Sequence, residues 1–219
     1  MYQKYIKRFL DFMIALIALP FVLIVILIVS PFILFNDGFP IFYNAERIGQ
    51  HGKLFKMYKF RSMKKDAPDI RLADGSTYNG EDDPRVTKIG KILRKTSIDE
   101  IPQLLNMLKG DMSLIGPRPD PPDWLEKYPE DVKVFLNVKP GITGYSQAYY
   151  RNSADGEEKM KNDGFYANIV LSGWMLKYFF KTIAVVLKHE NTYKDTNSEA
   201  NQISEKSKED LEQIKKVSN

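Results

Sequence analysis

The strongest constraint on this chain is an uncharged, apolar run at residues 12–35. About 20 apolar residues are enough to cross a bilayer as a helix, which satisfies its own backbone hydrogen bonds in the hydrocarbon. Lys7 and Arg8 precede the run, as they would in a secretory signal. The run is long for a signal, however, no small-residue cleavage site follows it, and Asp11 stands at its start. The run therefore predicts a helix in or on a membrane.

Basic residues flank this run on both sides. Because positive charge marks the cytoplasmic side of a membrane segment, both ends favour the same side. Pro20 removes one helical hydrogen bond, which indicates a re-entrant helix-break-helix that bends at Pro20 and returns to the face it entered. The alternative is a single span with a mild proline kink. The flanking residues are Lys4, Lys7 and Arg8 before the run, and Arg47, Lys53, Lys56, Lys59, Arg61, Lys64 and Lys65 after it.

The remaining sequence predicts one compact domain. The chain has 219 residues and no cysteine, which excludes disulfides and thiolate metal sites and favours a cytosolic body. A net charge of +4 suits contact with anionic membrane lipid or phosphates, and no nucleic-acid-binding module is recognisable. The expected fold is α+β and mainly helical. Its parts are a membrane anchor at 1–35, a compact membrane-associated domain with short strands at 36–188, and a polar, disordered tail at 189–219.

Local patterns predict the secondary structure of this domain. A stretch rich in Trp, Tyr and Phe at 171–187 indicates a helix lying in the membrane interface; a core helix or a contact within a homo-oligomer is the alternative. The other predicted elements are short strands at 40–43 and 54–60, and helices at 88–95, 101–109 and 157–168.

Asp99 and Glu100 stand where a helix is predicted to begin, because Pro102 lacks an N–H and fits the first helical turn. Free backbone N–H groups at that point would keep Asp99 ionised and attract a phosphate. Arg94 adds positive charge nearby. The alternative is that Ser97-x-x-Glu100 forms a capping box and Asp99 is simply exposed. The residue pattern alone favours this alternative.

Two stiff turns follow this pair. Gly116-Pro117-Arg118-Pro119 presents an arginine, and Pro140-Gly141-Ile142-Thr143-Gly144 is a glycine turn ahead of Gln147. Such turns let backbone amides approach a phosphate closely. Carboxylates, arginines and amides beside a membrane suit phosphoryl transfer, in which a carboxylate can act as a covalent nucleophile. A rigid structural corner is the alternative for Gly-Pro-Arg-Pro.

Several motifs in serial order make the chain resemble the bacterial sugar transferase family, the small monotopic phosphoglycosyl transferases. The resemblance covers about residues 5–188. The motifs are Lys7-Arg8-x-x-Asp11 with the apolar hairpin, Tyr58-Lys59-Phe60-Arg61-Ser62-Met63, Asp82-Asp83-x-Arg85-x-Thr87, Ser97-x-Asp99-Glu100-x-Pro102-Gln103-x-x-Asn106, Gly110-Asp111-Met112-Ser113, Gly116-Pro117-Arg118-Pro119 and Lys139-Pro140-Gly141-Ile142-Thr143-Gly144.

This resemblance implies an activity. Family members move a sugar-1-phosphate from a UDP-sugar to undecaprenyl phosphate and release UMP, which is the first membrane step of bacterial glycoconjugate synthesis. By resemblance, Asp99 would attack the β-phosphorus and form an aspartyl-phosphosugar intermediate. Glu100 would assist it through Mg²⁺ or proton handling, and both carboxylates would hold the metal. The enzyme would lie on the cytoplasmic face of the cell membrane as a monotopic protein.

The resemblance also implies roles for the other motif residues. Arg94 and Arg118 would hold phosphates of donor or acceptor, with Lys59 and Arg61 as further phosphate or headgroup contacts. The loop residues Gly116, Pro117 and Pro119 would shape the phosphate site, and Gly141, Thr143, Gly144 and Gln147 would border the nucleotide or the sugar.

Two other functions use the same residues. One is a membrane-anchored, metal-dependent phosphatase or pyrophosphatase, which would release phosphate instead of a lipid product. The other is a non-catalytic membrane adaptor, for which replacement of Asp99 would change nothing.

Overall fold

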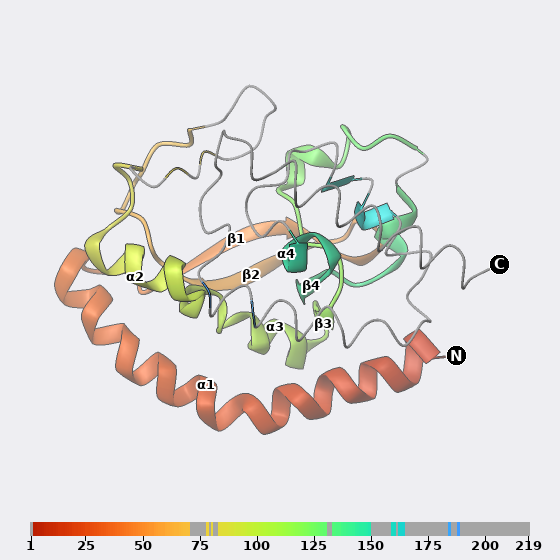
Figure 1. The fold of residues 1–219 in the computed structure, drawn as a ribbon, viewed down its shortest axis with the longest axis horizontal. Coiled ribbons are helices and arrows are strands. Elements are labelled where there is room, and N and C mark those ends of the chain that lie inside the picture. Colours follow the sequence, from red (N-terminus) through yellow and green to blue (C-terminus); the bar gives the residue numbers. More distant parts are fainter. Residues whose placement is uncertain are drawn as a thin grey trace.

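Figure 1 shows the computed structural model, in which a mixed domain of helices and short strands rests on one long helix. The structure describes residues 2–70, 78, 80, 83–130, 133–149, 159–160, 162–164, 184 and 188. A mixed fold with an apolar N-terminal helix is thereby confirmed. In the described chain the helices are α1 (Arg8–Asp37), α2 (Lys88–Thr96), α3 (Gln103–Lys109) and α4 (Tyr145–Tyr149). The strands are β1 (Phe42–Ile48), β2 (Leu54–Phe60), β3 (Ser113–Ile115) and β4 (Gly141–Thr143). Single turns of 3₁₀ helix lie at Gln50–Gly52, Ile98–Glu100 and Pro122–Trp124, and a longer one at Lys133–Asn137.

The helix α1 is continuous over 30 residues, with Pro20 and Pro31 inside it. The break expected at Pro20 is therefore a curve within one helix, which Figure 1 shows bowing along the domain. A proline removes only one backbone hydrogen bond, so a helix can continue through it with a bend. Ser30, just before the second proline, donates its hydroxyl back to Ile26 O at 2.5 Å, a contact that often accompanies a bent helix. The stretch Tyr5–Asp37 is long and apolar enough to cross a membrane, and only 17% of its most apolar part is buried.

The N-terminal end of α1 is fastened to α3 and β3. Carbonyls at the C-terminal end of a helix lack partners within that helix. Arg8 supplies them for α3, because its guanidinium donates to Met107 O at 2.7 Å and Leu108 O at 2.9 Å. Asp11 accepts a hydrogen bond from the backbone N–H of Leu114 at 3.0 Å. The motif Lys7-Arg8-x-x-Asp11 is therefore a fastening between the apolar helix and the domain.

The C-terminal end of α1 is fastened to the same domain through β2 and α2. Arg61, directly after β2, lies 2.9 Å from the Asp37 carboxylate and donates to the Asp37 carbonyl at 2.9 Å. Ile33 packs with Phe60 and Leu93 in a buried cluster. Both ends of α1 thus contact one domain, and the helix lies along it instead of standing away from it.

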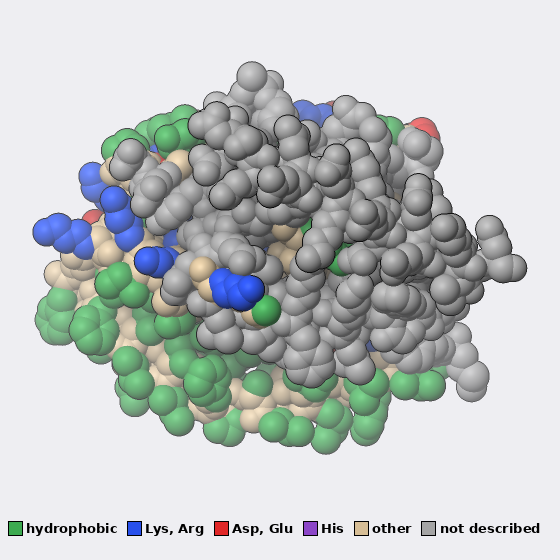
Figure 2. Space-filling model, in the orientation of Figure 1, with side chains coloured by type: hydrophobic (Ala, Val, Ile, Leu, Met, Phe, Trp, Pro, Cys, Tyr) green, Lys and Arg blue, Asp and Glu red, His purple; other side chains and the backbone are tan. Residues whose placement is uncertain are grey.

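One side of α1 faces the domain and the rest is exposed. Ala15, Val22 and Ile33 are buried, and the surrounding apolar side chains are open to solvent. Figure 2 shows them as a green band along the helix. A continuous apolar surface of this kind indicates contact with a membrane or a partner. The exposed residues include Phe9, Ile17, Phe21, Leu23, Ile24, Leu27, Ile28, Phe32 and Phe35.

The two sheets are small. β1 and β2 pair antiparallel from Phe42 opposite Phe60 to Ile48 opposite Leu54, and β3 pairs in parallel with β4. The strand expected at 54–60 is confirmed as β2. The strand expected at 40–43 starts later and runs further as β1, because pairing with β2 supplies hydrogen bonds up to Ile48. A second buried cluster, Ile48, Trp124, Tyr128 and Phe135, packs beside β1.

The helices expected at 88–95 and 101–109 appear as α2 and a shorter α3. Of the helix expected at 157–168, the described residues 159–160 and 162–164 are helical. The interfacial helix expected at 171–187 lies outside the described residues except for Ala184. The tail expected at 189–219 lies wholly outside them.

Gly90 fixes α2 against the segment that leaves β2. A Cβ atom at Gly90 would lie 1.9 Å from the Ser62 carbonyl oxygen, so only glycine permits this approach. The same carbonyl accepts a hydrogen bond from the Thr87 N–H at 3.1 Å, and the Thr87 hydroxyl caps α2 by accepting from Gly90 N at 2.9 Å. The position of α2 therefore depends on one missing side chain.

We expect Gly90→Ala to lower the free energy of unfolding by about 3 kcal/mol, because backbone atoms must move to admit the methyl group. This corresponds to a loss of roughly 10 °C in melting temperature, measured by thermal denaturation of purified protein in detergent. Lys91→Ala, at the next and exposed position of α2, is the control and should melt near the wild type. Equal melting temperatures for the two variants would contradict the packing described for Gly90.

Candidate active site

Asp99 and Glu100 lie in the 3₁₀ turn Ile98–Glu100, between α2 and α3. The chain enters this turn through Ser97, whose φ of 55° ends α2 in the left-handed region. The N-cap expected at about Asp99, for a helix at 101–109, is wrong: α3 begins at Gln103, because the turns around Pro102 have 3₁₀ bonding, with Leu104 N donating to Ile101 O at 3.1 Å. The capping-box alternative is also wrong, since Ser97 makes no side-chain cap hydrogen bond.

Two cationic side chains from distant parts of the chain meet this carboxylate pair. Lys59, on β2, places its ammonium 2.7 Å from Asp99 Oδ2 and 3.2 Å from Glu100 Oε1. Arg118, in the Gly-Pro-Arg-Pro loop, grips both oxygens of Glu100, at 2.7 and 3.3 Å. This two-point contact is the strongest arrangement for an arginine and a carboxylate. Side chains from β2 and from the Gly-Pro-Arg-Pro loop therefore meet at the turn Ile98–Glu100.

Burial and charge act differently on the two carboxylates. Asp99 is only 2% exposed, and this burial raises its pKa, with Lys59 opposing the shift and Glu100 adding to it. Burial would also raise the pKa of Glu100, but Arg118 and Lys59 outweigh it and hold that pKa well below its usual range. No hydrogen bond of good geometry reaches Asp99 Oδ2, although the Lys59 ammonium is close enough for an ion pair. Arg118 and Lys59 thus hold the Glu100 carboxylate in place, whereas the Asp99 carboxylate is less constrained.

Arg94 is held beside the same pair. It projects from the last turn of α2, and its Nε donates to the Ser62 hydroxyl at 3.0 Å. Its charge also lowers the pKa of Asp99, although it is a smaller influence than burial or Lys59. Lys59, Arg94 and Arg118 together bring three positive charges to two carboxylates. The excess favours an anionic ligand.

Arg61 contacts the C-terminal end of α1 instead of the carboxylate pair. It is buried, and its guanidinium holds the C-terminal end of α1 through Asp37 and the carbonyl of Gly38. This fastening could not be predicted from the sequence, because nothing in the motif shows which end of α1 lies beside Arg61. A contact between Arg61 and phosphate stays a prediction.

The two glycine turns interlock. Gly116 N donates to Thr143 O at 2.8 Å, and Gly141 N donates to Pro117 O at 2.8 Å. A Cβ on Gly144 would lie 2.1 Å from the Gly116 carbonyl oxygen. The amides of Gly116 and Gly141, expected to approach a phosphate, are therefore used to join the turns. The result is a rigid base for Arg118, as the structural-corner alternative proposed.

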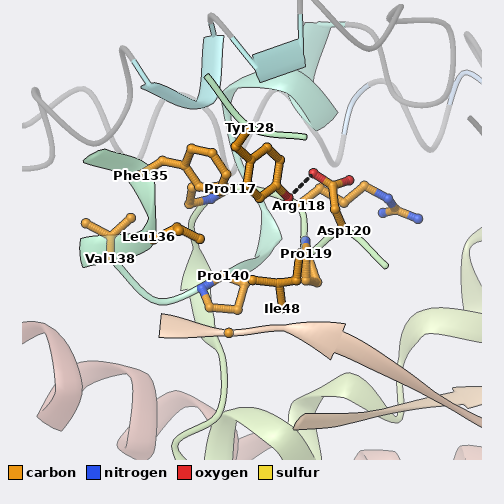
Figure 3. Close-up of a pocket in the computed structure, with 11 residues that line it drawn as sticks. Ile48, Pro117, Arg118, Pro119, Asp120, Tyr128, Phe135, Leu136, Val138 and Pro140 are labelled. Atoms are coloured by element: carbon orange, nitrogen blue, oxygen red, sulfur yellow. Dashed lines mark hydrogen bonds between the residues drawn. The ribbon is translucent and has the colours of Figure 1, made fainter. Parts of the chain in front are cut away.

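A small pocket lies behind the Gly-Pro-Arg-Pro loop, between it, the end of β1 at Ile48 and the turn Lys133–Asn137 (Figure 3). Tyr128 donates its hydroxyl to Asp120 at 2.8 Å at one side of this pocket. In Figure 3 the guanidinium of Arg118 points away from the apolar lining. The loop therefore separates an apolar support from the charged site.

A buried polar cluster behind Arg118 was missed by sequence reasoning. Lys159 donates to the Arg118 carbonyl at 3.2 Å and pairs with Asp120 at 2.7 Å and Asp163 at 3.1 Å. Although burial lowers the pKa of Lys159, these two carboxylates outweigh burial and raise it above its usual value. The spacing of four residues between Lys159 and Asp163 could have indicated that pair on a helix, but no spacing links them to Arg118 and Asp120. The cluster fixes the backbone from which Arg118 projects.

Gln147 lies in α4, next to Ser146, whose hydroxyl donates to Asp163 at 3.0 Å. Both polar atoms of the Gln147 side-chain amide are buried and have no hydrogen-bond partner among the described residues, and the same holds for the Asn162 side-chain nitrogen. Such groups cost about 1–3 kcal/mol each when unpaired. These amides are therefore suited to accept partners from a ligand.

Asn106 joins α3 to the strand that carries Lys59. Its Oδ1 accepts from the backbone N–H of Tyr58 at 2.8 Å, and its Nδ2 donates to the Lys56 carbonyl at 2.8 Å and to Asp111 at 3.2 Å. The side chain thus bonds to the edge of β2 as a neighbouring strand would. It is fully buried, so the register between Lys59 and the turn before α3 depends on it.

We expect Asn106→Asp to destabilise the protein by about 3 kcal/mol, because a buried carboxylate cannot donate to the Lys56 carbonyl and repels Asp111. Chemical denaturation in detergent measures this loss. Asn137→Asp, at an exposed position, is the matched control and should change stability by less than about 0.5 kcal/mol. A similar small change for Asn106→Asp would show that the amide does not hold β2.

Comparison with known proteins agrees with the geometry. The family model described as bacterial sugar transferase matches residues 2–189. The chain is 37% identical over 212 residues to an undecaprenyl-phosphate galactose phosphotransferase of Salmonella typhimurium, covering 87% of this chain and 42% of that protein. It is 34% identical over 190 residues to a UDP-N-acetylgalactosamine-undecaprenyl-phosphate N-acetylgalactosaminephosphotransferase of Aeromonas hydrophila, covering 84% of this chain and 44% of that protein.

A shorter relative is covered almost completely. The chain is 37% identical over 202 residues to the exopolysaccharide production protein ExoY of Sinorhizobium fredii, covering 85% of this chain and 88% of that protein. The match therefore concerns the region that holds α1, the carboxylate pair and Arg118, although the chain spans less than half the length of the two longer relatives. This chain belongs to the bacterial sugar transferase family.

Proposed function

We propose that this protein transfers a sugar-1-phosphate from a UDP-sugar to undecaprenyl phosphate and releases UMP, at the start of bacterial glycoconjugate synthesis. The observation that carries the proposal is the pair of buried Asp99 and partly buried Glu100 among Lys59, Arg94 and Arg118. A diphosphate donor and a phosphate acceptor are anions that such a site attracts. Relatives whose names state UDP-N-acetylgalactosamine and undecaprenyl phosphate support this choice of substrates.

Asp99 is the proposed nucleophile. One of its carboxylate oxygens attacks the β-phosphorus of the donor, the bond from that phosphorus to the UMP oxygen breaks, and UMP leaves with the electron pair. The resulting aspartyl phosphosugar is then attacked at phosphorus by an oxygen of undecaprenyl phosphate. The bond to Asp99 breaks, the carboxylate is restored, and the lipid diphosphate sugar is released. Glu100 is less suited to attack, because Arg118 occupies both of its oxygens.

The cations have separate proposed roles. Lys59 lies against Asp99 and holds it toward the substrate, and Arg118 and Arg94 bind phosphate oxygens where negative charge grows in the transition state. Gln147 is proposed to contact the nucleotide or the sugar, since its buried amide has no partner of its own. Gly141, Thr143 and Gly144, in the turn before Gln147, are proposed to border the same ligand.

Magnesium fits this set of residues. Mg²⁺ in phosphoryl-transfer sites takes one or two carboxylates together with phosphate oxygens of the substrate. Asp99 and Glu100 would be those carboxylates, and Asp99 Oδ2 is a buried oxygen without a hydrogen bond. Oxygens of the donor diphosphate would complete the coordination. The ion would neutralise the diphosphate of the donor.

We propose that α1 enters and leaves the membrane on the cytoplasmic face. The support is that Arg8 and Arg61 hold the two ends of α1 on one domain, while its outer surface is apolar. The acceptor phosphate lies at headgroup depth, so a domain held at that depth meets it without removing the lipid from the bilayer. Proximity then contributes to catalysis.

The activity is tested by UMP release from protein in nanodiscs with Mg²⁺, undecaprenyl phosphate and a panel of UDP-sugars. We expect UMP from the wild type with particular sugars only. We expect at least a thousandfold loss in Asp99→Asn, because the amide cannot attack phosphorus. Lys127→Gln is the control, at an exposed position whose ammonium pairs with Asp123. Full activity in Asp99→Asn, or release of inorganic phosphate in place of UMP, would overturn the proposal.

Removal of divalent cations with EDTA should also stop UMP release.

The membrane topology is tested with single cysteines, which are unique because the chain has none. Tyr5 and Phe39 are exposed at the two ends of α1. We expect a membrane-impermeant maleimide to label Tyr5→Cys and Phe39→Cys from the cytoplasmic side of inverted vesicles, and neither from the outside of intact cells. Labelling of the two positions from opposite sides would show a full span instead.

A further inference from the structure

The helix α2 has two unlike faces. Its inner face is apolar: Leu93 is buried and packs with Ile33 of α1 and Phe60 of β2. Its outer face carries Lys88, Lys91 and Lys95, all exposed and spaced to form one line along the helix. α2 contains no acidic residue, so the helix itself carries a net positive charge.

An apolar residue interrupts the line of lysines. Ile92 lies beside Lys91 and Lys95 and is 58% exposed, although the buried core is close at hand. We refer to Lys88, Lys91, Ile92 and Lys95 as the lysine stripe. Lysines with an apolar residue among them are typical of helices that lie at a membrane surface, because the ammonium groups reach the phosphates while the apolar side chain enters the interface.

The lysine stripe lies beside the apolar surface of α1. Ile26 and Val29 of α1 are partly buried and pack against the buried cluster that joins Leu93 to Ile33, so α2 packs on the C-terminal half of α1. Figure 2 shows Lys and Arg side chains just above the green band of α1, on the side where Figure 1 places α2. If the apolar band lies in the hydrocarbon, the stripe lies at the depth of the headgroups.

We infer that the lysine stripe of α2 binds the headgroups of anionic phospholipids. Charge complementarity and continuity with the apolar surface of α1 identify this partner. Each lysine near an anionic bilayer surface strengthens binding by about fivefold at moderate salt. The stripe then sets the depth and tilt of the domain on the membrane, which α1 alone does not fix, because a helix can roll about its axis.

This orientation bears on the active site and, in that respect, rests on the proposed function. α2 also carries Arg94, which bonds to Ser62 near Asp99. A helix with lysines on the headgroups and Arg94 near the nucleophile would hold the catalytic turn at the depth where a lipid phosphate lies. The lipid contact itself does not require the enzyme to be active.

The first test measures depth. A single cysteine at Ile92 carries an environment-sensitive fluorophore, and the full chain is placed in nanodiscs whose phosphatidylglycerol headgroups bear a nitroxide quencher. The control is Lys127→Cys. The Lys127 side chain is exposed and lies over the ring of Trp124, which belongs to the buried cluster beside β1. We expect quenching at position 92 to be several-fold stronger than at position 127. Equal quenching at both positions would overturn the inference.

The second test measures charge preference with the same fluorophore at position 92. Quenching by labelled phosphatidylglycerol is compared with quenching by labelled phosphatidylcholine, before and after Lys88→Gln, Lys91→Gln and Lys95→Gln are combined. We expect a preference for phosphatidylglycerol that the triple substitution removes, whereas Lys127→Gln with Lys133→Gln leaves it unchanged. A preference that survives the triple substitution would contradict the role of the stripe.

Loss of the preference on adding millimolar inorganic phosphate would identify a site for free phosphate instead and would overturn the lipid assignment. Neither readout depends on UMP release, so failure of the proposed activity is seen separately.

Discussion

The buried ion pairs of Asp99 and Glu100 with Lys59 and Arg118 are the interaction on which the rest of the structure depends. Two adjacent carboxylates can be buried only if cations compensate them, and here the cations come from β2 and from the Gly-Pro-Arg-Pro loop. Each partner must therefore be held firmly by its own surroundings. Asn106 fixes the strand of Lys59, and Lys159 with the interlocked glycine turns fixes the loop of Arg118. Much of the domain therefore serves to hold these four charged side chains in position.

The domain that holds these charges is also bound to both ends of α1. Arg8 caps the end of α3, a few residues after the carboxylate pair, and Arg61 directly follows the strand of Lys59. The elements that position the active site are thus the ones that hold the apolar helix. A chain built this way keeps its carboxylates at a fixed height relative to the apolar surface, which suits a reaction between a soluble donor and a phosphate at the membrane surface.

Periodicity and turn chemistry were enough to predict much of the fold. The strand at 54–60 and the helix at 88–95 follow from local patterns, because they are decided by residues adjacent in sequence. The start of α3 was predicted wrongly, since Pro102 permits both α and 3₁₀ turns and packing decides between them. The curve of α1 at Pro20 was expected as a break, because local rules do not show that both ends are fastened to one domain.

The site was predictable in part. Resemblance to a family singled out Asp99, Glu100, Lys59, Arg94 and Arg118, and the structure brings them together. The supporting contact of Lys159 with Asp120 was not found, because it joins segments with no common motif, although the pair Lys159 and Asp163 has helical spacing. Arg61 appeared to be another basic residue of the site, and only the three-dimensional arrangement shows it at the end of α1. Sequence patterns thus identify charged groups more readily than the partners that fix them.

The most direct measurement is the mass of the intact protein after incubation with Mg²⁺ and a UDP-sugar donor in the absence of undecaprenyl phosphate. We expect the wild type to gain the mass of one sugar phosphate, located on Asp99 by peptide mapping, and to lose it when undecaprenyl phosphate is added. Asp99→Asn should gain no mass. Release of UMP into lipid product by a protein that never carries this adduct, even on rapid quenching, would contradict the role given to Asp99.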